Sequence, residues 1–497
     1  MILGQRDLPW LVTGNLQTKE GLVSFSTSDH SGPAGFSLIL TSFQQKPGLP
    51  FADALPAEAI QAAFDAEGVA FAQEDDEVYT PQLTTWGWLS QALFKDELRS
   101  CRAAVARIAV LLVTLGRKPC SEDTGAYCRA RAKLPQPVIQ RLVYDLADGC
   151  EGKVPTEWLW FGLHVKLVDG AGLSMPDTPN NQAEYPQPSS QQEGLGFPFI
   201  RMVVLISLAT AMITGTALGP YSGKETGETA LFRQLFERLH RGDVVLGDRY
   251  FCSYFMICLL QELGVDVVTR LHQCRTADFR YGERLGPGDH VVEWPRPDRP
   301  EWMDEATYER MPATLRIREV EFKVSKKGFR PDTLVIVTTL LDAREYRRND
   351  LTDLYRRRWS VELDIRSIKS NMAMDVMRCQ SPQMVRKEIS VYLLAYNLIR
   401  QKMLQAALAS GKSPRQLSFT AAMQQIAAAW AVTPLLSEAE ASVLIATLQK
   451  HLKSQRVGNR PDRVEPRAVK RRPKVLALMT VPRDQARAEL LAGAGKT

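Results

Sequence analysis

The chain has 497 residues, of which 45% are hydrophobic and 24% charged, and its formal net charge at pH 7 is +6. This length predicts three or four domains, and the composition favours a soluble intracellular protein with large cores. The six histidines form no HxxxH or HxH pair, which argues against a zinc site or a histidine-dependent hydrolase. The eight cysteines are never spaced as CxxC and no signal peptide precedes them, so we expect reduced thiols.

The N-terminal part divides into two segments. Residues 1–47 are rich in glycine, serine and threonine, and we expect them to form a flexible extension. Residues 48–150 favour helices, and the helices on either side of 116–119 are spaced like a DNA-binding helix-turn-helix. An ordinary helical bundle with basic edges explains the pattern equally well. The DNA-binding candidates here are Arg129, Arg131 and Lys133.

Residues 151–272 alternate between predicted strands and helices. Asp169 and Asp248 each end an apolar run, where a strand is expected to enter a turn. Aspartate after a strand is also ordinary turn chemistry, so neither residue alone indicates a site. The order of these predicted strands and helices matches the first part of a ribonuclease-H-like α/β fold, in which Asp169 and Asp248 would lie on adjacent central strands.

The segment 202–223 contains no charged residue and is long enough to span a membrane as a helix. Its glycines, its proline and its many β-branched residues favour two buried strands joined by a turn instead. We therefore expect no membrane partner.

The most informative stretch is 354–370, which places four polar residues at offsets of three, four and seven. At ~100° per residue they fall within about 60° on one helix face. A carboxylate among two cations and a phenol suits phosphate chemistry, because the carboxylate can hold a metal while the others bind phosphate oxygens. The alternative is the solvated face of an amphipathic helix. The four residues are Tyr355, Arg358, Glu362 and Lys369.

The spacing Tyr-x2-Arg-x3-Glu-x6-Lys resembles the signature of the DDE transposases of bacterial insertion sequences, of the insertion-sequence-four type. This resemblance implies that Glu362 completes a catalytic and metal-binding triad with Asp169 and Asp248, and that the other three residues of the stripe bind DNA phosphates. One departure is local: the residues at 250–253 differ from the Glu-Ala-Asp of a better-known relative.

The implied reaction explains three carboxylates. Strand cleavage and transfer are in-line displacements at phosphorus, which two Mg²⁺ ions roughly 3.5–4 Å apart can assist. Mg²⁺ prefers oxygen ligands and retains waters, so three carboxylates and a substrate phosphate complete its shell. We expect Mn²⁺ to substitute.

The gap of 114 residues between Asp248 and Glu362 predicts an inserted domain. Short alternating runs favour a β-rich insertion at 273–332, between the first part of the core (151–272) and the second (333–432). In relatives, such an insertion supports a flipped base while the transposon end closes as a hairpin. Trp294 and Trp302 are the stacking candidates, although most tryptophans simply pack in cores.

Residues 433–497 are predicted to form a helical and basic C-terminal region. Between 456 and 474, eight basic residues accompany two acidic ones, with prolines that prevent a regular helix. We expect an arm that follows DNA phosphates, and a free solvated tail is the alternative. The candidate contacts are Arg467, Lys470, Arg471 and Arg472.

The resemblance therefore implies cut-and-paste transposition in the bacterial cytoplasm, associated with the nucleoid. A homodimer would cleave paired inverted repeats, form hairpins and join the ends to target DNA. Two alternatives stay open: a catalytically silent DNA-binding regulator descended from a transposase, and a structure-specific nuclease that cuts without joining.

Overall fold

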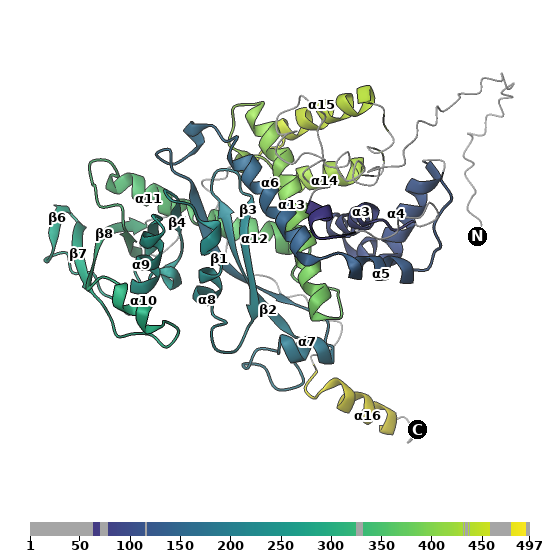
Figure 1. The fold of residues 1–497 in the computed structure, drawn as a ribbon, viewed down its shortest axis with the longest axis horizontal. Coiled ribbons are helices and arrows are strands. Elements are labelled where there is room, and N and C mark those ends of the chain that lie inside the picture. The colour runs from purple at the N-terminus through teal and green to yellow at the C-terminus, as the bar shows by residue number, and fades with distance from the viewer. Residues whose placement is uncertain are drawn as a thin grey trace, which may run out of the picture. The chain divides into compact units, whose positions relative to one another are not determined.

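The computed structural model describes residues 63–69, 78–114, 117–324, 332–430, 432, 436, 438–457 and 479–493. Within residues 35–497, these segments form a mixed α/β fold around one large sheet (Figure 1). The prediction of an α/β protein is therefore confirmed. The predicted extension at 1–47 and the arm residues Arg467, Lys470, Arg471 and Arg472 lie outside the described residues.

The described sheet has nine strands in the order β3-β2-β1-β4-β5-β9-β8-β7-β6. Strand β1 runs parallel to β4, β4 runs parallel to β5, and every other neighbouring pair is antiparallel. The strands β6 to β8, from the segment predicted as an insertion, extend this sheet by way of β9. The bounds are β1 (Val165–Ser174), β2 (Phe199–Ser207), β3 (Ile213–Pro220), β4 (Val244–Leu246), β5 (Asp266–Arg270), β6 (Glu283–Gly286), β7 (Asp289–Pro295), β8 (Thr314–Val324) and β9 (Asp332–Thr338).

The uncharged segment 202–223 forms most of the β2–β3 hairpin, as predicted. Alternate side chains of β2 enter two different cores: Met202 and Val204 join the cluster around α13, whereas Val203 and Leu205 join the cluster around α8. Burial on both faces explains why the segment needs no charge. No helix in the described part of the chain is long and apolar enough to cross a membrane.

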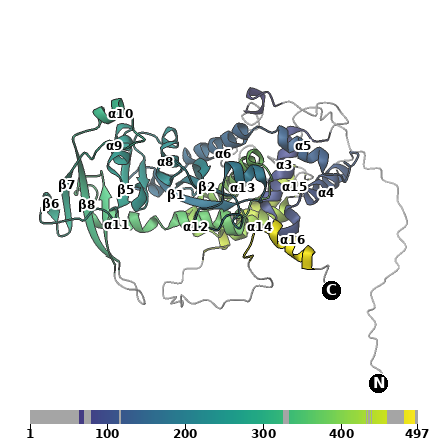
Figure 2. The same ribbon diagram turned by 90° about the horizontal axis from the view of Figure 1, so that it is seen from below.

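Helices cover both faces of β1–β3. On one side α6 contacts β3, and the 27-residue α13 packs against α3, α6, α14 and α15; on the other side α8 contacts β1, β2 and β3 (Figures 1 and 2). The bounds are α3 (Pro81–Leu93), α4 (Cys101–Thr114), α5 (Gly125–Lys133), α6 (Gln136–Glu151), α7 (Pro179–Glu184), α8 (Glu228–Arg233), α9 (Tyr254–Glu262), α10 (Glu305–Arg310), α11 (Arg348–Arg357), α12 (Ser360–Arg366), α13 (Pro382–Leu408), α14 (Phe419–Ala429), α15 (Glu438–Ser454) and α16 (Arg483–Gly493).

The stretch 354–370 is not the single regular helix that the spacing predicts. It contains the end of α11, then α12, then a π-helical turn η5 (Ser367–Asn371). At the break, the backbone amide of Arg358 donates to the carbonyl oxygen of Tyr355, and the amide of Val361 donates to the carbonyl oxygen of Arg358. These hydrogen bonds join residues three apart, as in a 3₁₀ turn, instead of the four-residue separation of an α-helix. The four residues of the stripe are consequently not all related by the 100° rotation per residue of a regular α-helix.

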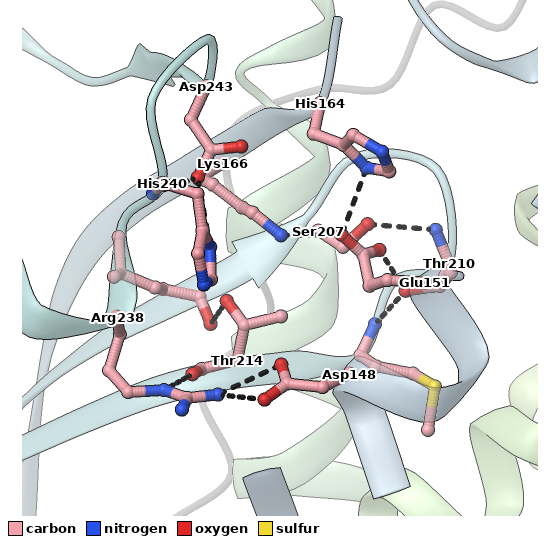
Figure 3. A network of polar contacts seen from close by, with 12 residues as sticks. Asp148, Glu151, His164, Lys166, Ser207, Thr210, Thr214, Arg238, His240 and Asp243 are labelled. Carbon is pink, nitrogen blue, oxygen red and sulfur yellow. Dashed lines mark hydrogen bonds and ion pairs between the residues drawn. The ribbon is translucent and has the colours of Figure 1, made fainter. Parts of the chain in front are cut away.

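A buried polar network fastens α6 to the start of β1 (Figure 3). Lys166 Nζ lies 2.5 Å from Glu151 Oε2, and both side chains are less than 10% exposed. His164 Nδ1 lies 3.3 Å from the same oxygen, and the Thr210 hydroxyl donates to the other carboxylate oxygen. Burial alone would raise the pKa of Glu151, but Lys166 and His164 lower it to about 2.

This network predicts a pH dependence of stability. The hydrogen bond to Glu151 raises the pKa of His164, so protonated His164 stabilises the folded state. The contribution is complete below the unfolded pKa of about 6.5 and disappears as the pH rises through the higher folded value. We expect His164→Gln to remove this part of the stability loss above about pH 6.5. Denaturant midpoints measured across that range test it, with His240→Gln as control because the His240 side chain is 70% exposed. Equal pH dependences of wild type and His164→Gln would contradict the assignment.

Candidate active site

Asp169 and Asp248 lie side by side just beyond the point where the pairing between the parallel strands β1 and β4 ends, a place that we call the aspartate edge. Leu167 of β1 is paired with Leu246 of β4, and each aspartate comes two residues later in the same direction. Asp248 follows the end of β4, as predicted. The prediction that Asp169 ends its strand is wrong, because pairing with β2 continues β1 from Asp169 to Ser174.

The surroundings of Asp169 raise its pKa above the ordinary value of an aspartate. Burial raises the pKa of Asp169 to about 6, with smaller contributions from the charges of Asp248 and Glu228. The Gly170 amide, which donates to Oδ1 at 2.8 Å, and the Arg358 guanidinium act in the opposite direction. Asp169 is therefore mostly ionised at neutral pH, within a group of interacting charges.

The segment around α12 brings the stripe to this edge. Arg358 Nη2 lies 2.8 Å from Glu362 Oε1, and this guanidinium also interacts with Asp169. Burial lowers the pKa of Arg358, but the hydrogen bond to Glu362 and the nearby Tyr355 and Asp169 outweigh burial and raise the pKa above its ordinary value. Burial raises the pKa of Tyr355 to about 12, and Tyr355 interacts with Arg358 and Asp248. Arg358 therefore links the aspartate edge to Glu362.

Lys369 has a different local role. Its Nζ donates to the carbonyl oxygen of Gly172 in β1 at 2.7 Å. This bond, together with the contacts between α12 and β1, fixes the helical segment on the strand that carries Asp169. Lys369 is half-buried rather than part of a fully solvated face.

The chemistry of the three carboxylates suits a hard cation, because Mg²⁺ takes oxygen ligands. In the residues that the structure describes, however, no three His, Cys, Asp or Glu side chains are close enough to share a metal ion. Asp169 and Asp248 interact, whereas the Glu362 carboxylate is held by Arg358. The donor set therefore fits the metal, but Glu362 does not join the two aspartates in this arrangement.

Sequence reasoning missed a fourth carboxylate at this edge. Glu228, the first residue of α8, packs so closely on β1 that a Cβ on Gly170 would lie 2.3 Å from its Cδ. Burial raises the pKa of Glu228, the charge of Arg201 opposes this, and Asp248 adds to the increase. Glu228 has no place in the Tyr-Arg-Glu-Lys spacing, so only the packing of α8 on β1 reveals it.

The two tryptophans proposed for base stacking occupy different environments. Trp294 is 5% exposed, its Nε1 donates to Glu319 Oε1 at 3.1 Å, and Arg275 lies 4.0 Å from its ring. Trp302 is half-buried, with the Arg233 guanidinium 3.8 Å from its ring centre. In this arrangement Trp294 is a core residue, and Trp302 is the more accessible of the two.

The basic candidates on α5 also differ in their exposure to solvent. Arg129 and Lys133 are exposed, whereas Arg131 is 6% exposed and lies over the ring of Trp88 at 4.1 Å. Arg131 thus packs inside the helical region instead of facing a duplex.

Residues 160–398 match the family described as Transposase DDE domain, a range that includes Asp169, Asp248 and Glu362. The transposase InsG for insertion sequence element IS4 of Escherichia coli (strain K12) is 26% identical over 397 residues, covering 79% of this chain and 85% of that protein. Both matches support an IS4-type DDE transposase domain in this chain, over residues 160–398. The chain also matches the putative transposase InsZ of the same organism, 24% identical over 131 residues, which are 23% of this chain and 43% of InsZ.

Among solved structures, the cryo-EM structure of a piggyBac transposase synaptic complex with hairpin DNA aligns with 84% of this chain and 81% of the piggyBac chain. The sequence identity is 10% and the TM-score 0.41. Transposase DDE domains generally occur in DNA-binding proteins whose phosphoryl-transfer chemistry uses divalent metal ions.

Proposed function

We propose that this protein is a transposase that moves an insertion sequence by cut-and-paste transposition, through end cleavage, a hairpin intermediate and strand transfer. One observation carries this proposal: parallel β1 and β4 bring Asp169 and Asp248 to one edge, and Arg358 connects that edge to Glu362. A protein that only binds DNA has no need for carboxylates gathered beside a guanidinium in this way.

The proposed core is ribonuclease-H-like. The order β3-β2-β1-β4-β5, with β2 antiparallel to both neighbours and β4 and β5 parallel to β1, supports this assignment. The core would comprise 151–272 and 333–432, interrupted by the β-rich insertion at 273–332. Residues 48–150 would contact the transposon ends, and 433–497 would contribute the basic arm.

Asp169, Asp248 and Glu362 are the proposed ligands of two Mg²⁺ ions. The ions would activate the attacking oxygen and neutralise the leaving oxygen of the phosphodiester. Asp169 can serve at neutral pH because its pKa of about 6 leaves it largely ionised. Glu362 would have to exchange Arg358 for the metal, and the released guanidinium would then be available to a DNA phosphate.

The proposed partners are the terminal inverted repeats, the flanking DNA and target DNA, bound by a homodimer that joins two ends. Incubating the full chain with Mg²⁺ and DNA carrying the repeats that flank its gene tests the function. Cleaved ends joined to a target plasmid are expected. Cleavage without joining would establish a nuclease, and end binding without cleavage would establish a regulator.

Substitutions in the stripe should separate chemistry from DNA handling. Arg358→Ala loses a charge-assisted phosphate contact, so we expect hairpin formation and strand transfer to fall roughly 10-fold to 100-fold. Lys369→Ala should show the same loss and also lower the melting temperature, because its bond to Gly172 disappears. Arg366→Ala is the matched control, since Arg366 is an exposed arginine at the end of α12, between the other two residues in sequence. Strand transfer at the control's level in both variants would assign Arg358 and Lys369 purely structural roles.

A further inference from the structure

A cavity of about 200 Å³ lies in the helical region, and its lining includes none of the residues proposed for catalysis. Residues of α3, α4, α5 and α13 contribute to its wall, together with the segment that precedes α13. The lining is rich in arginine, and its principal charged and polar members are Arg99, Arg131, Arg378, Glu388, Cys101 and Tyr392.

Arg99 is buried with unused hydrogen-bonding capacity. Its side chain is part of the cavity wall, and the residue is 8% exposed. Nη1 donates to the carbonyl oxygen of Ala373 at 2.7 Å, and the guanidinium lies 5.4 Å from the ring centre of Tyr392, with which it interacts. Neither Nε nor Nη2 has an acceptor in hydrogen-bonding geometry among the described residues. A buried charged donor without an acceptor is unfavourable, so this wall favours an anion.

Two further arginines make the cavity more positive. Arg131 is 6% exposed and directs Nη1 and Nη2 at the sulfurs of Cys101 and Cys379, at 3.0 and 3.1 Å, so it contributes mainly its charge. Arg378 is exposed, so the cavity reaches solvent beside a third guanidinium. Helix α4 begins at Cys101 and adds the positive end of its dipole.

The negative groups do not cancel this charge. The Glu388 carboxylate already accepts the backbone N–H groups of Arg378 and Cys379, at 3.0 and 2.9 Å. The hydrogen bond from Cys128, helped by Arg131 and opposed by burial, lowers the pKa of Cys101 to about 6. Even with Cys101 ionised, three guanidinium groups outnumber one carboxylate and one thiolate.

We propose that this cavity binds a phosphate-type oxyanion, with Arg99 and Arg378 as donors in the field of Arg131. Guanidinium groups match the oxygens of such an anion with paired N–H donors. The volume accommodates one oxyanion with several waters, each of which occupies about 30 Å³ in the liquid. The anion is either free phosphate or a backbone phosphate of bound DNA. This inference goes beyond the proposed transposition and holds or fails without it.

Calorimetric titration of the full chain with sodium phosphate, against sodium chloride at equal ionic strength, tests the site without DNA or metal. We expect one saturable phosphate site, weakened about tenfold or more in Arg99→Gln and Arg378→Gln. Arg102→Gln is the matched control, because Arg102 is an exposed arginine on α4 that does not line the cavity. Its affinity for phosphate should equal that of the wild type.

Circular dichroism of each variant checks folding, and exposed Arg378 keeps the test decisive if Arg99→Gln unfolds. No saturable phosphate signal, or equal affinities of Arg378→Gln and Arg102→Gln, would overturn the proposal. A second arm identifies the source once phosphate binding is established. Weaker DNA binding by Arg378→Gln than by Arg102→Gln, with competition by added phosphate, identifies a DNA phosphate. Equal DNA binding by the two variants identifies the free ion.

Discussion

Asp169→Asn is expected to lower Mg²⁺-dependent cleavage of transposon ends by about a thousandfold or more, because the metal contributes several kcal/mol of transition-state stabilisation. The amide keeps the size of the side chain and the acceptor oxygen that the Gly170 amide contacts, but it removes the negative charge. Asp248→Asn and Glu362→Gln should give losses of similar size. Affinity for end DNA should stay near the wild-type value, since carboxylates do not attract phosphates.

The matched control for these variants is Asp177→Asn, which removes an exposed carboxylate a few residues after β1. Cleavage of a labelled end fragment and its binding in a gel-shift assay are measured on the same preparations. Near-normal cleavage by any one of the three variants would exclude that residue from the triad. Loss of cleavage together with loss of binding would instead indicate a folding defect.

Glu151→Ala should lower the free energy of unfolding by about 3–5 kcal/mol, because it leaves Lys166 as an unpaired buried charge. Asp145→Ala is the control: it breaks an ion pair with Arg141 whose side chains are 43% and 61% exposed, and such pairs contribute about 0–1 kcal/mol. The double variant Glu151→Leu, Lys166→Met removes both charges and should recover much of the loss. Chemical denaturation of the four proteins measures these differences.

Acid provides an independent test of the same network. The pKa of Glu151 is lowered to about 2, so its stabilising contribution is complete above its unfolded value of about 4.3 and is lost as the pH falls through about 2. Glu151→Ala should therefore lose less stability than the wild type between those two values. In the stability comparison, a free energy of unfolding lowered no more by Glu151→Ala than by Asp145→Ala would show that Lys166 finds another partner or remains hydrated.

Features set by local pattern could be predicted from the sequence. The uncharged, β-branched segment 202–223 forms two buried strands, and the short apolar run before Asp248 forms β4. In each case the burial pattern along a few residues determines the element, and distant packing does not alter it.

Features set by distant contacts could not be predicted in this way. Asp169 lies within a strand because β2 pairs beyond it, and Glu228 reaches the same edge because α8 packs on Gly170. The burial of Arg131 depends on Trp88 and Cys379, which are far from it in the sequence. The break at Arg358 replaces a regular helix in the most informative motif, although Arg358 and Glu362 still meet as spacing of four predicts.

The proposed metal site of Asp169, Asp248 and Glu362 at one edge of the sheet can be located by iron-directed cleavage. Fe²⁺ replaces Mg²⁺ in the protein bound to end DNA, and added hydrogen peroxide and ascorbate generate hydroxyl radicals that cut the chain beside the ion. We expect fragments that end close to residues 169, 248 and 362. These fragments should disappear with excess Mg²⁺ and in Asp169→Asn. Cuts elsewhere in the chain, or cuts that Mg²⁺ does not suppress, would contradict a metal site formed by these three residues.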